Sequence, residues 1–134
     1  MAVAAGAATL AELKDHPPYK ALDHNGKILE EGFRHAAAEA GIPCFIARVG
    51  SMMTMFFQTG AFPEGIRRVT GWKTSRESNT EQYAKFFWGM IEHGIYLPCS
   101  QYEALFFSSA HTENEIQQTV NAAKQVLLQI ASDK

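Results

Sequence analysis

Glu103 is the side chain of this sequence that is best placed to do chemistry. It stands in GIYLPCSQYEALFFSSAHT, residues 94–112, where it is the one carboxylate among apolar and uncharged polar residues. A turn is expected at Pro98–Gln101, before it, and an apolar strand at Ala104–Ser108, after it. A carboxylate at the start of a strand lies either at a solvated edge or in a cleft, and the residues alone favour the solvated edge.

The other reactive side chains form no familiar catalytic or metal-binding pattern. No two of the five histidines have the i,i+4 spacing of a helical ligand pair, and HExxH, GxGxxG and GxxxxGK[ST] are all missing from the sequence. Cys44 and Cys99 belong to no CxxC pair, so we expect reduced thiols in a cytoplasmic protein. We therefore expect no metal ligands, no cofactor-binding residues and no catalytic residues in this chain.

Length and composition fit one ordinary globular domain. The chain has 134 residues, 46% of them hydrophobic, and a formal net charge of −2. Nucleic-acid binding needs clustered Lys and Arg, and the densest basic spot is the pair Arg67-Arg68. No apolar run reaches the roughly 18 residues that span a bilayer. The composition therefore argues against nucleic-acid and membrane partners.

Apolar periodicity predicts four helices. They cover Ala2–Lys14, Tyr19–Ala40, the segment between Ser78 and Gly94, and the segment after Thr112. Capping boxes at Ser78–Glu81 and Thr112–Glu115 are expected to start the last two. Glycines at positions 41 and 94 are expected to end the helices before them.

The sheet is expected to be built around a hairpin. Cys44–Val49 and Met52–Gln58 are rich in β-forming residues and flank the turn pair Gly50-Ser51. The strand Ala104–Ser108 is expected to join them, and Thr59–Asn79 reads as a long polar loop. The order predicts an α+β fold in which a small, mainly antiparallel sheet of three to four strands carries helices on one side.

The first helix stands apart from the rest of the chain. It has no capping residue ahead of it, and Pro17-Pro18 separates it from the next helix. The first helix therefore looks like a helix cut from a longer one, and we expect a boundary between residues 1–18 and residues 19–134.

Several motifs together resemble one enzyme family. AVAAGAATLAELK, EAGIP, the hairpin with GSM and FF, and above all QYAKFFWGMIEHGIYLPCSQYEALFFSSAHT are similar to the C-terminal part of glutamate-1-semialdehyde 2,1-aminomutase. This enzyme belongs to the class III aminotransferases, which are fold-type-I pyridoxal-phosphate (PLP) enzymes. The loop Thr59–Asn79 fits the family least well, and Leu105 stands where many members have Gly. The resemblance implies that residues 1–18 are the truncated end of a linker helix from the large domain and that residues 19–134 form the small C-terminal domain.

The resemblance implies the activity of a parent enzyme rather than of this chain. The family converts glutamate 1-semialdehyde to 5-aminolevulinate in tetrapyrrole (porphyrin) biosynthesis, as a homodimer that uses pyridoxal and pyridoxamine phosphate. The cofactor-binding lysine lies in the family's large domain, and none of the seven lysines here is expected in a shielded pocket. The chain alone is therefore expected to bind no cofactor and to be inactive, with the missing large domain as its partner and a tendency to self-associate through exposed apolar surface.

The resemblance also gives Glu103 a role. The matching glutamate in the family points toward the active site, where its charge disfavours the wrong carboxylate substrate. Its neighbours Ser100, Gln101 and Tyr102 are carried over as substrate-side residues. Two alternatives remain, namely a piece of another class III aminotransferase and a free-standing α+β interaction module.

Overall fold

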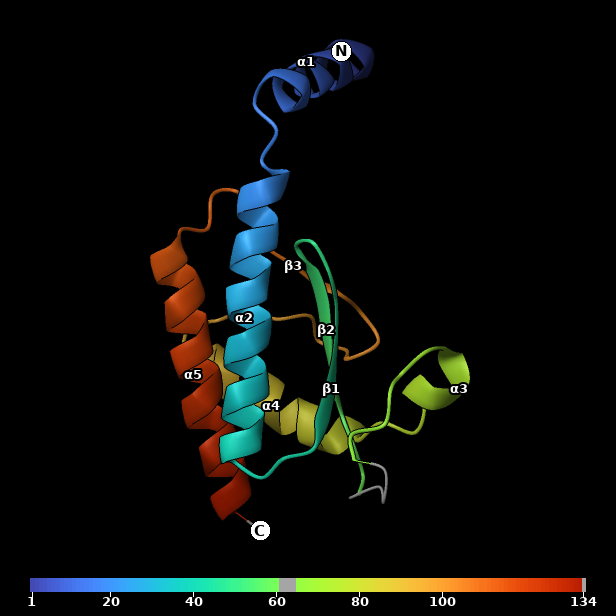
Figure 1. Cartoon of the computed structure of the whole chain (residues 1–134), viewed down its shortest axis with the longest axis vertical. Coiled ribbons are helices and arrows are strands. Elements are labelled where there is room, and N and C mark those ends of the chain that lie inside the picture. The colour runs from blue at the N-terminus through green and yellow to red at the C-terminus, as the bar shows by residue number, and fades with distance from the viewer. Residues whose placement is uncertain (61–64, 134) are drawn as a thin grey trace.

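The fold is a three-stranded antiparallel sheet with helices on one side. The computed structural model describes residues 1–60 and 65–133, and Pro63 of the expected loop and Lys134 lie outside them. The strands have the order β1-β2-β3, and α2, α4 and α5 lie on one side of the sheet (Figure 1). This confirms the predicted α+β class. In chain order the elements are α1 (Ala2–Asp15), α2 (Tyr19–Glu39), β1 (Cys44–Val49), β2 (Met52–Phe57), α3 (Trp72–Ser75), α4 (Thr80–Glu92), β3 (Leu105–Phe106) and α5 (Glu113–Ser132).

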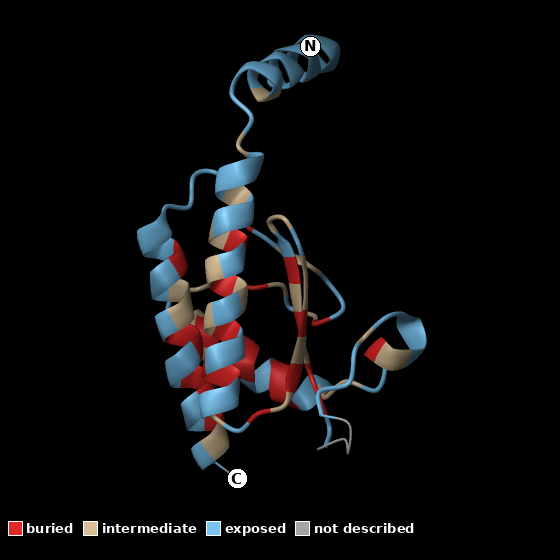
Figure 2. Cartoon of the chain, in the orientation of Figure 1, coloured by how far each residue is buried: buried red, intermediate tan, exposed pale blue. Residues whose placement is uncertain are grey.

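The hydrophobic core lies between helices α2, α4 and α5 and the face of the sheet that these helices cover (Figure 2). Glycines let α5 approach its neighbours closely: a Cβ on Gly32 of α2 would lie 2.5 Å from the Val120 side chain, and one on Gly89 of α4 would lie 2.6 Å from that of Val126. The predicted apolar stripes are buried here, because each repeats at helical spacing. The most deeply buried large side chains are Phe33, Met53, Phe57, Phe86, Met90, Gln101 and Leu127.

The hairpin has the predicted register. Val49 pairs with Met52 across the two-residue turn, and Gly50 has the positive φ of 58° that the turn requires. Alternate strand residues point toward the helices, which gives the buried set Cys44, Ile46, Met53, Met55 and Phe57.

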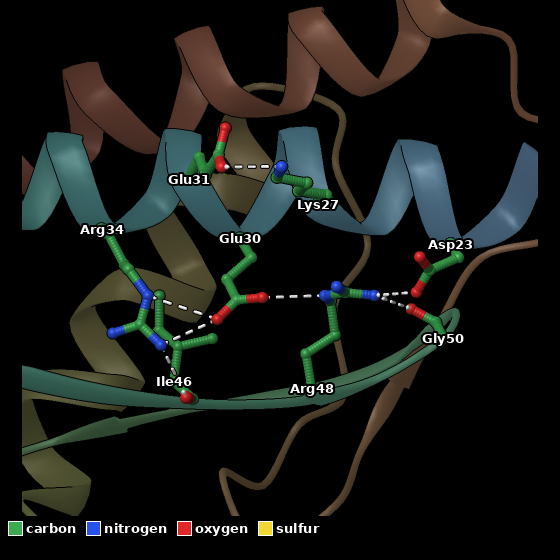
Figure 3. Close-up of polar contacts among 8 residues, drawn as sticks. All are labelled: Asp23, Lys27, Glu30, Glu31, Arg34, Ile46, Arg48 and Gly50. Carbon is green, nitrogen blue, oxygen red and sulfur yellow. Dashed lines mark hydrogen bonds and ion pairs between the residues drawn. The ribbon is translucent and has the colours of Figure 1, made fainter.

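Arg48 ties this hairpin to α2 (Figure 3). Its Nε donates to Glu30 Oε2 at 2.8 Å, and its Nη1 donates to Asp23 Oδ1 at 2.8 Å and to the Gly50 carbonyl at 2.9 Å. The other oxygen of Glu30 accepts from Arg34 Nη2 at 2.8 Å. Burial disfavours the charged form of Glu30, but the hydrogen bonds from both arginines outweigh it and hold the pKa of this carboxyl below its ordinary value.

Gly26 makes room for this contact. A Cβ at position 26 would lie 2.4 Å from the Gly50 carbonyl oxygen, a distance that real Cβ atoms essentially never show. The glycine in the first third of α2 therefore allows the hairpin turn to touch the helix.

Within the expected loop at Thr59–Asn79, the described residues 65–79 are more ordered than their polar sequence indicates. It contains the short helix α3 and a bridge between Gln58 and Ser78. The Gln58 side chain also bonds both backbone groups of Arg67, which gives the segment a second anchor. Side-chain pairing with the backbone, which leaves no periodic signal, is the physical reason that the prediction missed this order.

Several expected element bounds are wrong. Helices α1 and α2 and strand β2 end at Asp15, Glu39 and Phe57, each one residue from the expected end. The strand predicted at Ala104–Ser108 is reduced to Leu105–Phe106, because only Met53 and Met52 of β2 pair with it, and Phe106 is 69% exposed. Helix α4 is capped by Asn79, whose Oδ1 accepts from the Gln82 amide at 3.0 Å, one residue later than the predicted Ser78.

Candidate functional site

The segment that carries Glu103 begins where α4 ends. Gly94, with φ of 76°, turns the chain out of the helix. Tyr83 of α4 then holds the next residues, since its hydroxyl donates to the Pro98 carbonyl at 2.6 Å. Burial, with smaller contributions from Cys99 and Glu103, raises the pKa of Tyr83 to about 12. Tyr83 is therefore a neutral donor that fixes the approach to the turn.

Residues 100–103 form a tight turn against β2. The Glu103 amide donates to the Ser100 carbonyl at 3.1 Å, and the Tyr102 amide donates to Ser100 Oγ at 3.2 Å. Thr54 Oγ1 of β2 donates to the Glu103 carbonyl at 3.3 Å. Ser100 therefore shapes the turn, while Thr54 fixes the backbone of Glu103 to the sheet.

Gln101 points inward from this turn and is 2% exposed. Its Oε1 accepts from the Phe57 amide at 3.1 Å, where a neighbouring strand would otherwise supply an acceptor. Its Nε2 is buried and has no hydrogen-bond partner among the described residues. In this structure Gln101 anchors the turn, and its expected contact with a substrate stays a prediction.

Tyr102 points to the outer side, where it meets the 65–79 segment. Its ring lies 5.8 Å from that of Trp72, centroid to centroid, and the Arg76 guanidinium lies 5.8 Å from the Trp72 ring centre. Both aromatic side chains stay exposed, Tyr102 by 45% and Trp72 by 67%. The long loop is therefore brought next to the candidate turn by an aromatic contact 30 residues apart in sequence, which no local pattern predicts.

Glu103 itself is exposed and lines a cavity of about 370 Å³. The cavity lies between the 95–107 segment and helices α2 and α5, and most of its walls are apolar side chains, among them Leu29, Phe33, Leu97, Phe107 and Ile116. The two environments that the sequence left open for Glu103, solvent and cleft, are thus both present at this residue.

His111 lines the same cavity, although it belongs to no sequence motif that predicts a binding or catalytic role. Its Nδ1 accepts from the Ser108 amide at 3.2 Å, so the hydrogen of the neutral ring resides on Nε2. The Asn25 side chain bonds the His111 carbonyl at 3.5 Å. The signal available in the sequence was the position of His111 just ahead of the α5 capping box, where Thr112 donates its amide to Glu115 Oε2 at 2.6 Å.

The described residues include neither a shielded lysine nor a cluster of metal-ligating side chains. PLP needs a lysine amine in a shielded pocket, and each lysine that the structure describes is exposed. Within residues 1–60 and 65–133, no group of three or more His, Cys, Asp and Glu side chains could hold a metal ion. In the same part of the chain, no helix is both long enough and apolar enough to cross a membrane.

Comparison with known proteins gives close relatives of much greater length. The chain is 45% identical over 127 residues to a glutamate-1-semialdehyde 2,1-aminomutase of Rhodopirellula baltica, and 41% identical over 131 residues to that of Sulfurihydrogenibium sp.. These matches cover 95% and 98% of this chain but only 27% and 29% of the relatives. No protein-family model matches the chain.

Solved structures show the same fold. A transaminase with PLP bound matches 92% of this chain and 26% of its own, with a TM-score of 0.67 and 19% identity. An omega-transaminase from Sphaerobacter thermophilus matches 85% of this chain with a TM-score of 0.61 and 18% identity. In sequence, the chain is thus similar to the C-terminal quarter of a glutamate-1-semialdehyde 2,1-aminomutase, as the motif at residues 94–112 indicated, and in fold it is similar to part of a transaminase.

Proposed function

We propose that this chain is the C-terminal domain of a glutamate-1-semialdehyde 2,1-aminomutase, an isomerase of tetrapyrrole biosynthesis in the cytoplasm. The 45% identity to the R. baltica enzyme over 95% of the chain carries the proposal. The chain spans only 27% of that enzyme, so the remaining three quarters supply the large domain and its PLP. The exposure of every described lysine supports a chain that is inactive alone.

Glu103 is the residue through which this domain acts on the substrate. Its turn is held to β2 through Thr54 and Gln101, so the backbone that presents its carboxylate has a defined position. A fixed negative charge at the site disfavours substrates that place a carboxylate there. Ser100, Gln101 and Tyr102 shape the turn that presents it.

The division into residues 1–18 and 19–134 is part of the same proposal. Helix α1 contributes no buried residue, and Val3 and Leu10 on it are 87% and 70% exposed. In the parent homodimer these side chains pack against the large domain. Alone, the chain self-associates through such apolar surface.

A chimaeric enzyme tests the proposal. The quarter of the R. baltica aminomutase that matches this chain is replaced by residues 1–134, and formation of 5-aminolevulinate from glutamate 1-semialdehyde is measured. We expect an active chimaera. Glu103→Gln in the chimaera is expected to relax discrimination against other carboxylate substrates. A chimaera that folds and binds PLP but does not convert the substrate would contradict the proposal.

A further inference from the structure

Glu103 lines the 370 Å³ cavity, and its carboxylate is exposed and has no cationic partner among the described residues. No described Lys, Arg or His side chain pairs with it, although the cavity walls around it are mostly apolar. A carboxylate beside apolar walls is the arrangement that stabilises a ligand carrying both a positive charge and an apolar body. A volume of this size falls in the range of about 300–1,000 Å³ that small-molecule sites occupy.

Across the same cavity, His111 offers a hydrogen-bond donor. Because Nδ1 accepts from the Ser108 amide, the hydrogen of the neutral ring is on Nε2, which makes Nε2 the donor of this lining residue. The cavity therefore combines one anionic acceptor, one neutral donor and apolar walls from Leu29, Phe33 and Ile116.

We propose that this cavity binds small primary amines that carry an apolar body. The ammonium group pairs with the Glu103 carboxylate, and the body lies against the side chains of α2 and α5. All of these groups belong to this chain, so the site does not depend on the proposed enzyme function.

Three six-carbon probes separate charge from apolar contact. The full chain is titrated with hexylammonium, 1-hexanol and hexanoate, and binding is followed by NMR shifts of the backbone amides at residues 104–107 and 116–119. We expect hexylammonium to bind about threefold more tightly than 1-hexanol, because a charged pair with an exposed carboxylate is weak, and hexanoate to bind most weakly. Hexanol or hexanoate binding as tightly as hexylammonium, or no saturable binding of hexylammonium, would overturn the proposal.

Matched variants assign the charge. Glu103→Gln is expected to lower the affinity for hexylammonium about threefold and to leave that for 1-hexanol unchanged. Glu113→Gln removes an exposed carboxylate at the start of α5 that does not line the cavity, and should change neither affinity. An unchanged hexylammonium affinity in Glu103→Gln contradicts the proposal. Amine binding without activity in the chimaera would retain this site and reject the enzyme function.

Discussion

Glu30 joins the hairpin to the helical layer, and its protonation should weaken the fold. Both of its oxygens accept from arginines, at 2.8 Å from Arg48 and from Arg34, and its side chain is only 22% exposed. Glu30→Gln removes the charge that both guanidiniums face. We expect a loss of roughly 1.5–3 kcal/mol in the free energy of unfolding at pH 7, measured by urea denaturation.

The pH dependence follows from the lowered pKa of Glu30. A carboxyl whose pKa is lower in the folded than in the unfolded state stabilises the fold when it is ionised. This stabilisation is fully present at a pH above the unfolded pKa of about 4.3, and it is lost as the pH falls through the folded pKa. The difference between wild type and Glu30→Gln should therefore shrink below pH 4. Glu31→Gln is the control, because Glu31 is 66% exposed and lies 3.8 Å from Lys27. A Glu31 effect as large as that of Glu30 would contradict this account.

Gln101→Met tests whether Gln101 anchors the candidate turn. The substitution keeps the length of the side chain but removes the acceptor for the Phe57 amide, together with the buried Nε2 that has no described partner. The two effects oppose each other, so we expect a net loss of only about 1 kcal/mol. Hydrogen exchange should show faster exchange of the Phe57 amide in particular. Gln118→Met, on the exposed side of α5, should leave that amide unchanged.

At this scale the sequence located the turn but not the directions of its side chains. Ser100, Gln101, Tyr102 and Glu103 are contiguous, so the family motif placed them together. Whether Gln101 points inward depends on the Phe57 amide, 44 residues away, and no local pattern contains that information.

At the element scale, the predictions that succeeded rest on repeated signals. Helices α2, α4 and α5 each repeat their apolar positions over several turns, and the hairpin combines two β-rich runs with a two-residue turn. The predicted length of strand β3 was wrong, because an apolar run gives no information on how many residues of β2 are available to pair with it. Helix α3 was not predicted, because a helix of only four residues is too short to show a repeated apolar pattern.

Gly26→Ala should destabilise the fold although alanine favours a helix. The new Cβ would lie 2.4 Å from the Gly50 carbonyl oxygen, so α2 and the hairpin must separate. We expect a loss of about 1–3 kcal/mol, as for overpacking of a well-packed core. Gly6→Ala in α1 is the matched control, since no atom lies within 4 Å of its Cβ, and it should raise helicity in circular dichroism. Equal stability of Gly26→Ala and wild type would show that the two elements do not touch in solution.

For the whole molecule, the two thiols report folding. Cys44 is buried and Cys99 is exposed, so one thiol should react with Ellman's reagent in the native state and the second only on unfolding. Burial raises the pKa of Cys44 to about 11. Its neutral thiol therefore stabilises the fold fully at a pH below the unfolded-state pKa of about 8.5. As pH rises from there to about 11, wild type should lose roughly 2–3 kcal/mol relative to Cys44→Ala. Parallel pH profiles would contradict the burial of this thiol.

The separateness of α1 can be tested by deletion. None of its residues is buried, and Pro17-Pro18 separates it from α2, so removing residues 1–16 should take away no packing that stabilises the sheet and its helices. We expect the free energy of unfolding to change by less than about 0.5 kcal/mol, as for surface positions.

The same deletion removes the exposed apolar side chains of Val3 and Leu10 together with α1, and it should weaken self-association in sedimentation experiments. Deleting α5, which supplies Ile116, Val126 and Leu127 to the core, is the contrasting variant and should abolish cooperative unfolding. A loss above about 1 kcal/mol on removing residues 1–16 would mean that α1 is part of the folded unit, and the division at residue 18 would have to be abandoned.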